Sequence, residues 1–356
     1  MQSIRILDKD FNLLGEIDSY EEFKIIRRFF SISEFELKIN FNKLHSGKLI
    51  KNNLLLLGKN YNKVCIILHR EIDGDGKKDN LLIKGYTLEG LVSRRLIIPN
   101  IDESFESCIG KQETIIKHFV NKNCVTTVDK FRKIDNLIIA EDKARGKDDS
   151  WRSSYENLDD KLKEICTYCN LGWNITFDKD KKKFVFDVIE GRDLTVNQEI
   201  NPPVIFRSDF NNIASRQYIE SIVNSKNVAY AGTKGDSTKL VLSSGNVEGF
   251  ERIESFKDVN LDDSLEIKKQ ADIVLNELAE LKSFSLNIKH SNTFIYETDY
   301  DLGDVVTIQD RKLNITMNSR IVEITETHNK NGMKMEAVFG SSIPTFLDKI
   351  KMKVRG

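Results

Sequence analysis

Short runs of alternating apolar residues recur near both ends of the chain, and this period of two constrains the fold more than any other feature. Near the start, Phe35, Leu37 and Ile39 alternate with polar residues, and a charged, Gly-containing turn joins the apolar runs 64–72 and 81–85. Near the end, the alternation returns within residues 284–288, 305–308 and 320–340. Successive side chains of a strand point to opposite faces, so both ends are predicted to consist mainly of β-strands.

The middle of the chain has helical spacing. Short helices are predicted near residues 88–92 and 114–119, a longer one at 159–171, and a hairpin from residues 173–177 and 184–188. The charged stretch 141–154 is predicted to be an exposed loop. The strongest helix is predicted over residues 262–282, with acidic residues at its start and an apolar stripe made of Leu261, Leu265, Val274, Leu275, Leu278 and Leu281.

These patterns predict an α+β, β-rich fold with several modules, because 356 residues exceed one ordinary core. Pro202 and Pro203 interrupt regular structure and mark a boundary. We expect modules at residues 1–97, 98–200, 201–258 and 259–345, followed by a basic segment at 346–356. The hairpins at residues 64–85 and 320–340 have similar layouts, which leaves open whether the two ends are an internal repeat.

Composition excludes several classes of protein. Lys plus Arg number 54 against 55 for Asp plus Glu, so the chain has no cationic excess for bulk binding of nucleic acid. No apolar run approaches the ~20 residues that span a bilayer, and the start lacks the layout of a signal peptide. Five scattered cysteines argue against a disulfide framework and for synthesis in a reducing compartment.

Two motifs with possible metal chemistry are better explained structurally. The segment 71–79 resembles a calcium loop, but Leu82 stands where a bidentate Glu is required, so a charged hairpin turn is expected. Cys166 and Cys169 have the spacing of a zinc or redox pair, but they come late in a helix and no second pair completes four ligands. We therefore expect Cys166 to be a core residue and no metal or cofactor to be bound.

No catalytic constellation is evident either. The five histidines lie apart from one another and from any recognisable nucleophile turn. The Gly-containing segment 232–239 lacks the order of a phosphate loop and is predicted to be a hairpin tip. The acidic pairs Asp159–Asp160 and Asp262–Asp263 are predicted to be charges at helix starts. The sequence therefore favours a protein that is not an enzyme.

The last residues form a basic segment whose apolar side chains alternate with cations. Such a segment is either a solvated tail or a strand that adds to the sheet edge of a neighbouring subunit or partner. The candidate contact residues are Lys349, Ile350, Lys351, Met352, Lys353, Val354 and Arg355.

Several stretches, taken in their order, resemble the siphophage tail-hub family, which includes the N-terminal part of tail-associated (Tal-type) proteins and the baseplate hubs of contractile tails and tail-like bacteriocins. They are residues 85–95 (GYTLEGLVSRR), 171–173 (LGW), 190–195 (EGRDLT), 211–230, 300–306 (YDLGDVV) and 320–324 (RIVEI). The resemblance covers most of the chain.

This resemblance implies two tail-tube-like β-barrels flanking an α/β insert, and a homotrimeric ring that joins a sixfold tail tube to a threefold tip or spike. Its lumen would pass DNA or the tape-measure protein, and its partners would be the tail tube or distal tail protein and a spike or tip protein, at the distal tail end. Only about fifteen residues follow Gly340, so we expect no appended lysin. The alternative is a tail-associated peptidoglycan hydrolase or cell-wall-binding protein with an aromatic cleft formed by Trp151, Tyr155 and Trp173.

Overall fold

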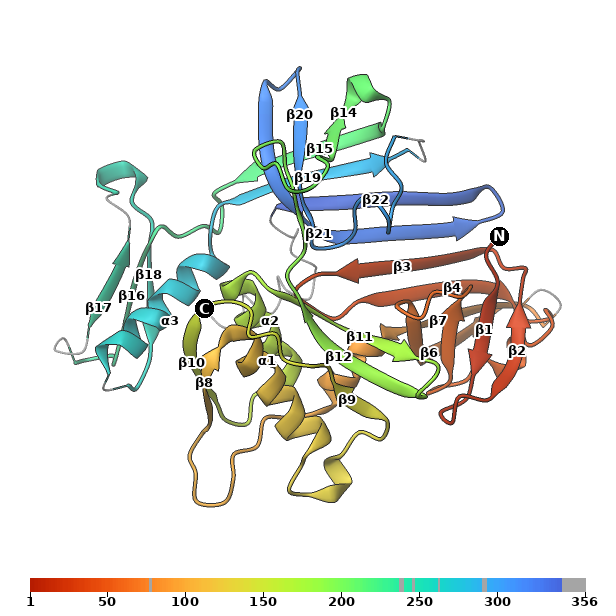
Figure 1. Ribbon diagram of the computed structural model, residues 1–356, viewed down its shortest axis with the longest axis horizontal. Coiled ribbons are helices and arrows are strands. Elements are labelled where there is room, and N and C mark those ends of the chain that lie inside the picture. The colour runs from red at the N-terminus through yellow and green to blue at the C-terminus, as the bar shows by residue number, and fades with distance from the viewer. Residues whose placement is uncertain (77–78, 237–239, 245–246, 262, 290–292, 341–356) are drawn as a thin grey trace. The chain divides into compact units, whose positions relative to one another are not determined.

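The computed structural model describes residues 1–76, 79–236, 240–244, 247–261, 263–289 and 293–340 (Figure 1). The chain divides into two compact units. The first holds Met1–Ser215 and Leu286–Ala337, and the second holds Arg216–Ser285 and the described residues from Val338 onward. The first unit therefore combines both ends of the sequence pattern, although seventy residues, Arg216–Ser285, separate its two segments along the chain.

The N-terminal part of the first unit is built from strands joined by short turns. As predicted, β6 and β7 form an antiparallel hairpin, in which Cys65 faces Thr87 and Asp73 faces Asn80. The elements are β1 (Ile4–Leu7), β2 (Leu13–Ile17), β3 (Glu22–Arg28), β4 (Glu34–Asn40), η1 (Ser46–Lys48), β5 (Leu54–Leu57), β6 (Val64–Asp73), β7 (Asn80–Thr87) and the 3-10 helix η2 (Leu88–Arg94).

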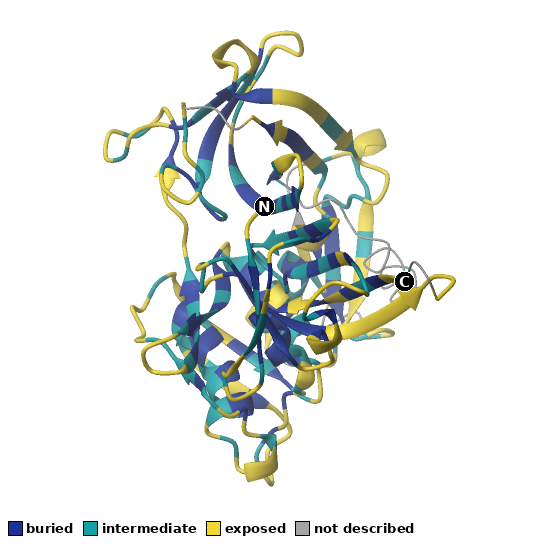
Figure 2. Cartoon of the chain, turned by 90° about the vertical axis from the view of Figure 1, so that its right-hand side faces the viewer, coloured by how far each residue is buried: buried dark blue, intermediate teal, exposed yellow. Residues whose placement is uncertain are grey.

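Alternation along these strands produces the core. Phe35, Leu37 and Ile39 of β4 are buried, while the residues between them are partly or fully exposed. They pack in one cluster with inward-facing side chains of β1, β3, β6 and β7, including Ile25 and Ile67. Figure 2 shows the same division, with buried residues along strands and helix faces and exposed residues in the connecting loops.

The insert that follows packs two helices against short strands. Its elements are β8 (Glu106–Lys111), α1 (Gln112–Val120), the π-helical turn η3 (Asn121–Val125), η4 (Lys130–Arg132), β9 (Leu137–Ile139), β10 (Asp148–Ser153), α2 (Leu158–Cys169), β11 (Gly172–Asp178) and β12 (Lys183–Ile189). The predicted hairpin is present as β11 and β12. The loop predicted at 141–154 is confirmed for residues 141–147, which are mostly exposed and have no regular structure, and is wrong for the second half, where β10 pairs with β8 and buries Trp151.

The C-terminal strands continue the N-terminal sheet. They are β13 (Asp193–Leu194), β14 (Ile205–Arg207), β15 (Ile213–Ser221), β19 (Leu281–Ile288), β20 (Val305–Asp310), β21 (Ile315–Asn329) and β22 (Gly332–Gly340), with the short η5 (Ser208–Phe210) after β14. The strand order is β15-β19-β22-β21-β3-β4-β7-β6-β5-β1-β2, and β20 joins β13 and β14 to β21. Fourteen strands thus form one sheet, in which β3 and β21 connect the two ends of the chain.

The second unit contains a small sheet with one helix packed on it. Its strands β16 (Val228–Gly232), β17 (Val241–Ser244) and β18 (Glu254–Asp258) have the order β17-β16-β18, and η7 (Gly249–Glu251) precedes β18. Residues 232–239 lie between two antiparallel strands, as expected of a hairpin tip, although 237–239 are outside the described residues. Helix α3 (Ser264–Glu277) covers one face of the sheet.

Helix α3 is shorter than predicted. It ends at Glu277, and strand β19 already begins at Leu281. Leu265 of the predicted apolar stripe is 76% exposed, because the buried face consists of Ile267, Ala271, Ile273 and Val274 instead. Asp263 is the N-cap and accepts hydrogen bonds from the backbone N–H groups of Leu265 and Glu266, while Asp262 lies outside the described residues.

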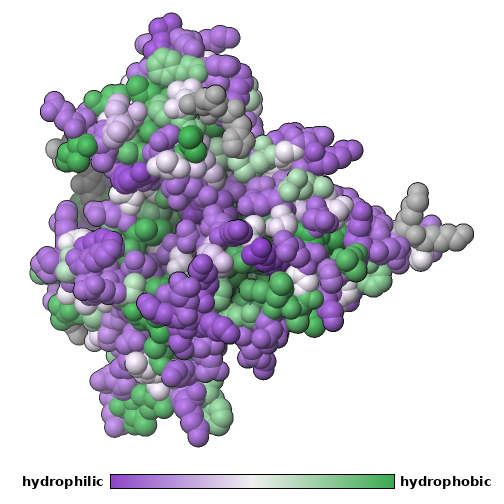
Figure 3. Space-filling view, turned by 45° about the vertical axis from the view of Figure 1, so that its right-hand side comes forward, coloured by the Kyte–Doolittle hydropathy of each residue, from purple (hydrophilic) through white to green (hydrophobic). Residues whose placement is uncertain are grey.

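The fold is α+β and rich in strands, as the sequence predicted. None of the described helices is long and apolar enough to cross a membrane. On the face drawn in Figure 3, apolar side chains are interspersed with hydrophilic ones. The division into five modules and the two tube-like barrels stay predictions.

Candidate functional site

The structural centre of the first unit is the seam where β3 meets β21. The two strands are antiparallel, with Phe23 opposite His328, Ile25 opposite Glu326, and Arg27 opposite Ile324. Because side chains alternate, Ile324, Glu326 and His328 all point to the buried side of β21. An acid and a histidine therefore occupy two buried positions of β21 that hydrophobic residues normally fill.

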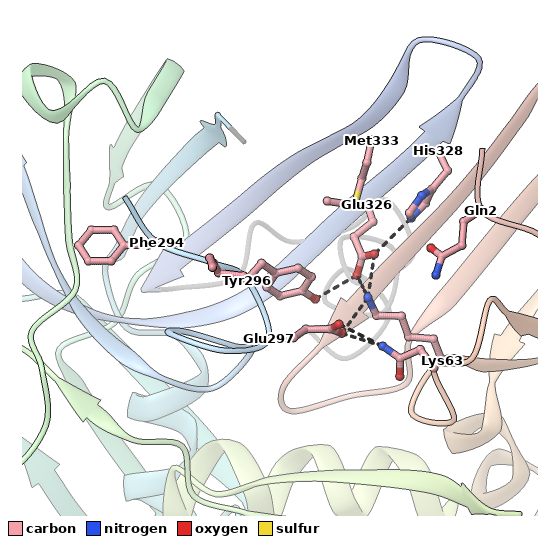
Figure 4. Close-up of a pocket in the computed structure, with 10 residues that line it drawn as sticks. Gln2, Lys63, Phe294, Tyr296, Glu297, Glu326, His328 and Met333 are labelled. Atoms are coloured by element: carbon pink, nitrogen blue, oxygen red, sulfur yellow. Dashed lines mark hydrogen bonds and ion pairs between the residues drawn. The ribbon is translucent and has the colours of Figure 1, made fainter. Parts of the chain in front are cut away.

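Lys63, which lies just before β6, neutralises the buried acid. Its Nζ lies 2.7 Å from Oε1 of Glu326 and 2.8 Å from Oε2, and the two side chains are 6% and 1% exposed. The same Nζ lies 2.8 Å from Oε1 of Glu297, which is one-third exposed and also accepts hydrogen bonds from Asn60. Figure 4 shows these groups converging from separate strands and loops.

Arg27 and Tyr296 extend the network. The Tyr296 hydroxyl donates to Oε1 of Glu326 at 3.0 Å and accepts from Arg27 at 2.7 Å. Arg27 also donates to Asp301 at 2.9 Å, and the Lys63 ammonium lies 5.0 Å from the centre of the Tyr296 ring. Residues from β3 and the β5–β6 turn are thereby tied to the segment before β20 and to β21. These bonds define the seam network: Arg27, Lys63, Tyr296, Glu297, Asp301, Glu326 and His328.

The electrostatics of the seam network follow from burial and pairing. Burial by itself raises the pKa of Glu326, but the hydrogen bond with His328 and the charges of Lys63 and Arg27 outweigh it and lower the pKa to about 2. Burial raises the pKa of the Tyr296 hydroxyl well above its usual value. The neighbouring Tyr296, Asp301 and Glu326 keep the pKa of Arg27 well above its usual value despite desolvation. At neutral pH the network therefore contains paired ions around a neutral phenol.

A pocket of about 300 Å³ opens beside the seam network. Its charged side chains Lys63, Glu297 and Glu326 are paired with one another. This pairing holds the strands together and engages these charged groups with one another. The lining residues are Gln2, Asn60, Lys63, Phe294, Ile295, Tyr296, Glu297, Glu326, His328 and Met333 (Figure 4).

A second junction surrounds Phe29, which follows β3 and is fully buried. Gly172 of β11 and Gly303 before β20 both press against its ring, so that a Cβ added at either glycine would lie 2.3 Å from a ring carbon. Gly303 also has φ +94°, a conformation that favours glycine. The Arg320 guanidinium lies 4.9 Å from the centre of the same ring. The N-terminal sheet, the insert and the C-terminal strands therefore meet at one side chain.

Backbone contacts complete this second junction. Arg320 donates to the carbonyls of Gly303 and Glu190, the latter at 2.6 Å, and to Asn170 at the end of α2. Arg192 holds both carboxylate oxygens of Asp304, with Nη2–Oδ2 at 2.7 Å and Nε–Oδ1 at 3.4 Å, and the Asp304 side chain is 4% exposed. Bidentate pairing of this kind fixes orientation as well as distance.

The structure brings together four of the stretches on which the family resemblance depends. Residues 171–173, 190–195, 300–306 and 320–324 contribute Gly172, Arg192, Gly303, Asp304 and Arg320 to the second junction. These four stretches thus supply contacts among the N-terminal sheet, the insert and the C-terminal strands. Residues 349–355, the predicted partner contact, lie outside the described residues.

The aromatic cleft of the alternative interpretation is wrong. Trp151 and Trp173 are 5% and 1% exposed, and only Tyr155 of the three is open to solvent. Trp151 is held by Asp149, and its ring packs on Tyr168. The tryptophans therefore support the core of the insert.

The cysteine prediction is confirmed for Cys166, which is fully buried and whose thiol pKa is raised by burial. Among the described residues, no group of three or more His, Cys, Asp or Glu side chains has the arrangement of a metal site. Asp159 and Asp160 lie in the first turn of α2, as predicted.

Sequence reasoning missed Phe29, Lys63 and Glu326. One signal was available for the acid, because Glu326 and His328 have the same parity as the apolar Ile324 in a strongly alternating strand. Two polar residues at inward positions indicate a buried polar network. Nothing in the sequence identified Lys63 as their partner, since it precedes them by 263 residues.

Comparison with known proteins agrees with this architecture. The family described as Siphovirus ReqiPepy6 Gp37-like protein matches residues 3–341. No curated protein sequence matches. A tail protein from Neisseria meningitidis MC58 has a similar structure, with 13% identity, a TM-score of 0.62, and coverage of 96% of this chain and 97% of that one.

Two further solved structures share the fold over nearly full length. The 43 kDa tail protein of prophage MuSo2 from Shewanella oneidensis is 9% identical, with a TM-score of 0.59 and coverage of 95% and 98% of the two chains. The prophage tail protein gp18 from Listeria monocytogenes EGD-e is 12% identical, with a TM-score of 0.55 over 100% of both. The predicted relation to phage tail proteins is confirmed, and the chain belongs to the Siphovirus ReqiPepy6 Gp37-like protein family.

Proposed function

We propose that this protein is a non-enzymatic structural hub of a phage or phage-tail-like particle. Three copies form a ring that joins the sixfold tail tube to the threefold tip or spike. The ring lies at the distal end of the tail, and its lumen passes DNA or the tape-measure protein. Membership of the family and the fold shared with tail proteins support the tail assignment.

The observation that carries the proposal is the pairing of β3 with β21. It joins the two strand-rich ends of the chain in one sheet, and the buried pair Lys63–Glu326 fixes the seam. In a ring where each subunit presents two tube-like modules, the two modules must keep a fixed position and orientation relative to each other when force acts on the tail. A continuous hydrogen-bonded seam supplies that rigidity, whereas a flexible linker does not.

The free edges of the sheet suggest how copies associate. Strand β2 ends the strand path on one side, with Leu13 59% exposed, and β15 ends it on the other, with residues 214–217 exposed. Exposed edges carry unpaired backbone groups that invite another strand. Edge-to-edge pairing of neighbouring copies would use these groups within a closed ring.

The partners of the hub are a second and third copy of itself, the tail tube or distal tail protein, the tape-measure protein and a spike or tip protein. The near-zero net charge of −1 fits a lumen that lets DNA pass without holding it, and we propose no membrane contact and no sequence-specific binding of nucleic acid. The protein is made in the bacterial host cytoplasm before assembly.

Two measurements test the ring. Native mass spectrometry of the purified protein is expected to show a trimer, and imaging of assembled particles is expected to place the chain at the distal tail end. A stable monomer in the assembled state would contradict the proposed trimer. A position elsewhere in the particle would contradict the proposed role as a hub.

Zymography on cell walls tests the proposal that the protein is not an enzyme. Purified protein is expected to leave peptidoglycan intact, because the charged groups of the seam pocket are paired and both tryptophans are buried. Clearing of the wall by the wild-type protein, lost in a denatured sample, would replace the proposal by a tail-associated hydrolase.

A further inference from the structure

Strand β18 in the second unit is an unusually open sheet edge. It pairs with β16 on one side, and no strand among the described residues pairs with its other side. Four of its five residues are exposed, and the fifth, Ser255, is partly so. A regular strand with an unpaired row of N–H and C=O groups is a template for an added strand.

The two faces of this edge differ in chemistry. Ser255 and Lys257 lie opposite Ala229 and Ala231, on the face that α3 covers. Glu254, Phe256 and Asp258 therefore share the other face.

That other face also carries an apolar row across the sheet. Phe256 lies opposite Tyr230, which in turn lies opposite Leu242, and Phe256 and Leu242 are 48% and 46% exposed. An added strand beside β18 would thus meet an acid, an aromatic ring and a second acid at alternate positions.

Within the described residues the two acids are contacted by groups of their own small sheet and its turns, and Tyr230 of the adjacent strand β16 donates a long hydrogen bond of 3.5 Å to Glu254. Glu254 is 2.6 Å from Arg252 two residues earlier, and its side chain is half exposed. Asp258 accepts a backbone N–H from Lys234 at 3.1 Å. Both carboxylates retain oxygen lone pairs for further cations.

The chain itself contains a segment whose pattern complements this edge. Residues 349–355 read KIKMKVR, so cations occupy every second position and apolar side chains the positions between. In an extended conformation all four cations lie on one face. Cations on that face would match Glu254, Phe256 and Asp258 in turn, through two ion pairs and a cation–π contact.

We infer that residues 349–355 of one copy add as a strand to the β18 edge of a second copy of this chain. The basic face meets Glu254, Phe256 and Asp258, and Ile350, Met352 and Val354 extend the apolar side that α3 covers. The occupant is identified by charge complementarity and strand periodicity, and the choice of a second copy rests on the proposed ring, in which each subunit has neighbours.

Charge reversal tests the inference in the full chain. One variant carries Glu254→Lys with Asp258→Lys, and another carries Lys349→Glu, Lys351→Glu and Lys353→Glu. For each variant alone, the dissociation constant of the oligomer is expected to be about tenfold or more higher than that of the wild type. The reason is that charges of opposite sign across the contact become charges of the same sign. Glu248→Lys with Glu251→Lys makes the same charge change off the strand and is expected to assemble normally.

Mixing separates contact between copies from contact within one chain. In a ring of three that contains both reversed variants, two of the three contacts become complementary, so the equimolar mixture is expected to assemble better than either variant alone. No recovery on mixing, with full recovery in a single chain that carries both reversals, would overturn the second copy as occupant. Circular dichroism must show that each variant keeps the wild-type thermal midpoint.

A peptide experiment does not depend on the ring. A labelled peptide of residues 341–356 is expected to bind the full-length tail-reversed variant in fluorescence anisotropy, with affinity that falls as salt rises. Binding should be lost when Glu254→Lys and Asp258→Lys are added. Unchanged peptide binding would overturn the inference even where the ring forms. A monomeric wild-type protein that still binds the peptide would overturn the proposed ring and the second copy as occupant, and would leave only the recognition of residues 349–355 by β18.

Discussion

The ammonium of Lys63 lies 2.7 Å from a carboxylate oxygen of Glu326, and both side chains are almost completely buried. The pair joins the turn before β6 to β21 across 263 residues of sequence. Taking two ions out of water is unfavourable unless geometry and further hydrogen bonds compensate, which Tyr296, Glu297 and His328 provide here. The contact therefore ties β21 to the turn before β6, and the loss of either ion would leave the other one buried without its partner.

Lys63→Met is expected to lower the free energy of unfolding by about 3–5 kcal/mol, because Glu326 would stay buried without its cation. Urea denaturation followed by circular dichroism measures the loss. Lys38→Met is the control, since Lys38 is 51% exposed and pairs with Glu22 and Glu36 at the surface, where a loss of at most about 1 kcal/mol is expected. Equal losses in both variants would contradict the role of the seam network.

Acid is expected to weaken the seam through Glu326. Its folded-state pKa of about 2 is lower than the 4.5 of an unperturbed Glu, so its contribution is complete above about pH 4.5 and is lost as pH falls toward 2. The contribution amounts to about 3 kcal/mol at neutral pH. Glu326→Gln should flatten this part of the curve of unfolding free energy against pH, and a parallel curve would contradict the prediction.

Glu89 is expected to act in the opposite direction. Burial raises its folded-state pKa to about 7, so the folded protein binds this proton more tightly than the unfolded chain. Stability from this group is greatest below about pH 4.5 and declines until about pH 7. Glu89→Gln should therefore raise the unfolding free energy by about 2 kcal/mol at pH 8 and by much less at pH 5. Glu21→Gln, at an exposed position, should change neither value.

Gly303→Ala is expected to disrupt the second junction. The new Cβ would lie 2.3 Å from the Phe29 ring in a backbone conformation of φ +94°, so a loss of about 3 kcal/mol or more is expected. Gly332→Ala has a similar φ of +106° but open space around it, and should lose only about 1–2 kcal/mol. Thermal unfolding compares the two. In a Phe29→Leu background the difference should shrink, and its persistence would exclude the ring as the cause.

Local patterns predicted the local elements well. The hairpins β6–β7 and β11–β12 follow from alternation and turn residues, which act over a few neighbours. Errors arose where tertiary contacts override local composition. The charged stretch that contains β10 becomes a strand because β8 offers it a partner, and α3 ends early because the chain there enters β19.

The candidate site divides in the same way. The motifs around Gly172, Arg192 and Gly303 were visible in the sequence as features of a family, yet their physical purpose was not, because each contacts a residue far away along the chain. Phe29 could not be singled out from the sequence, because it is one of many apolar residues near a strand. Only the fold shows that the glycines leave room for its ring.

By itself the sequence determined the strand-rich ends, the helical middle and the absence of a recognisable catalytic motif, because periodicity and residue chemistry are local properties. Only the tertiary structure decided that β3 pairs with β21 and that Lys63 meets Glu326. Partner choice between distant strands depends on how buried surfaces and charges complement one another in three dimensions. That information is spread over the whole chain and is not carried by any single segment.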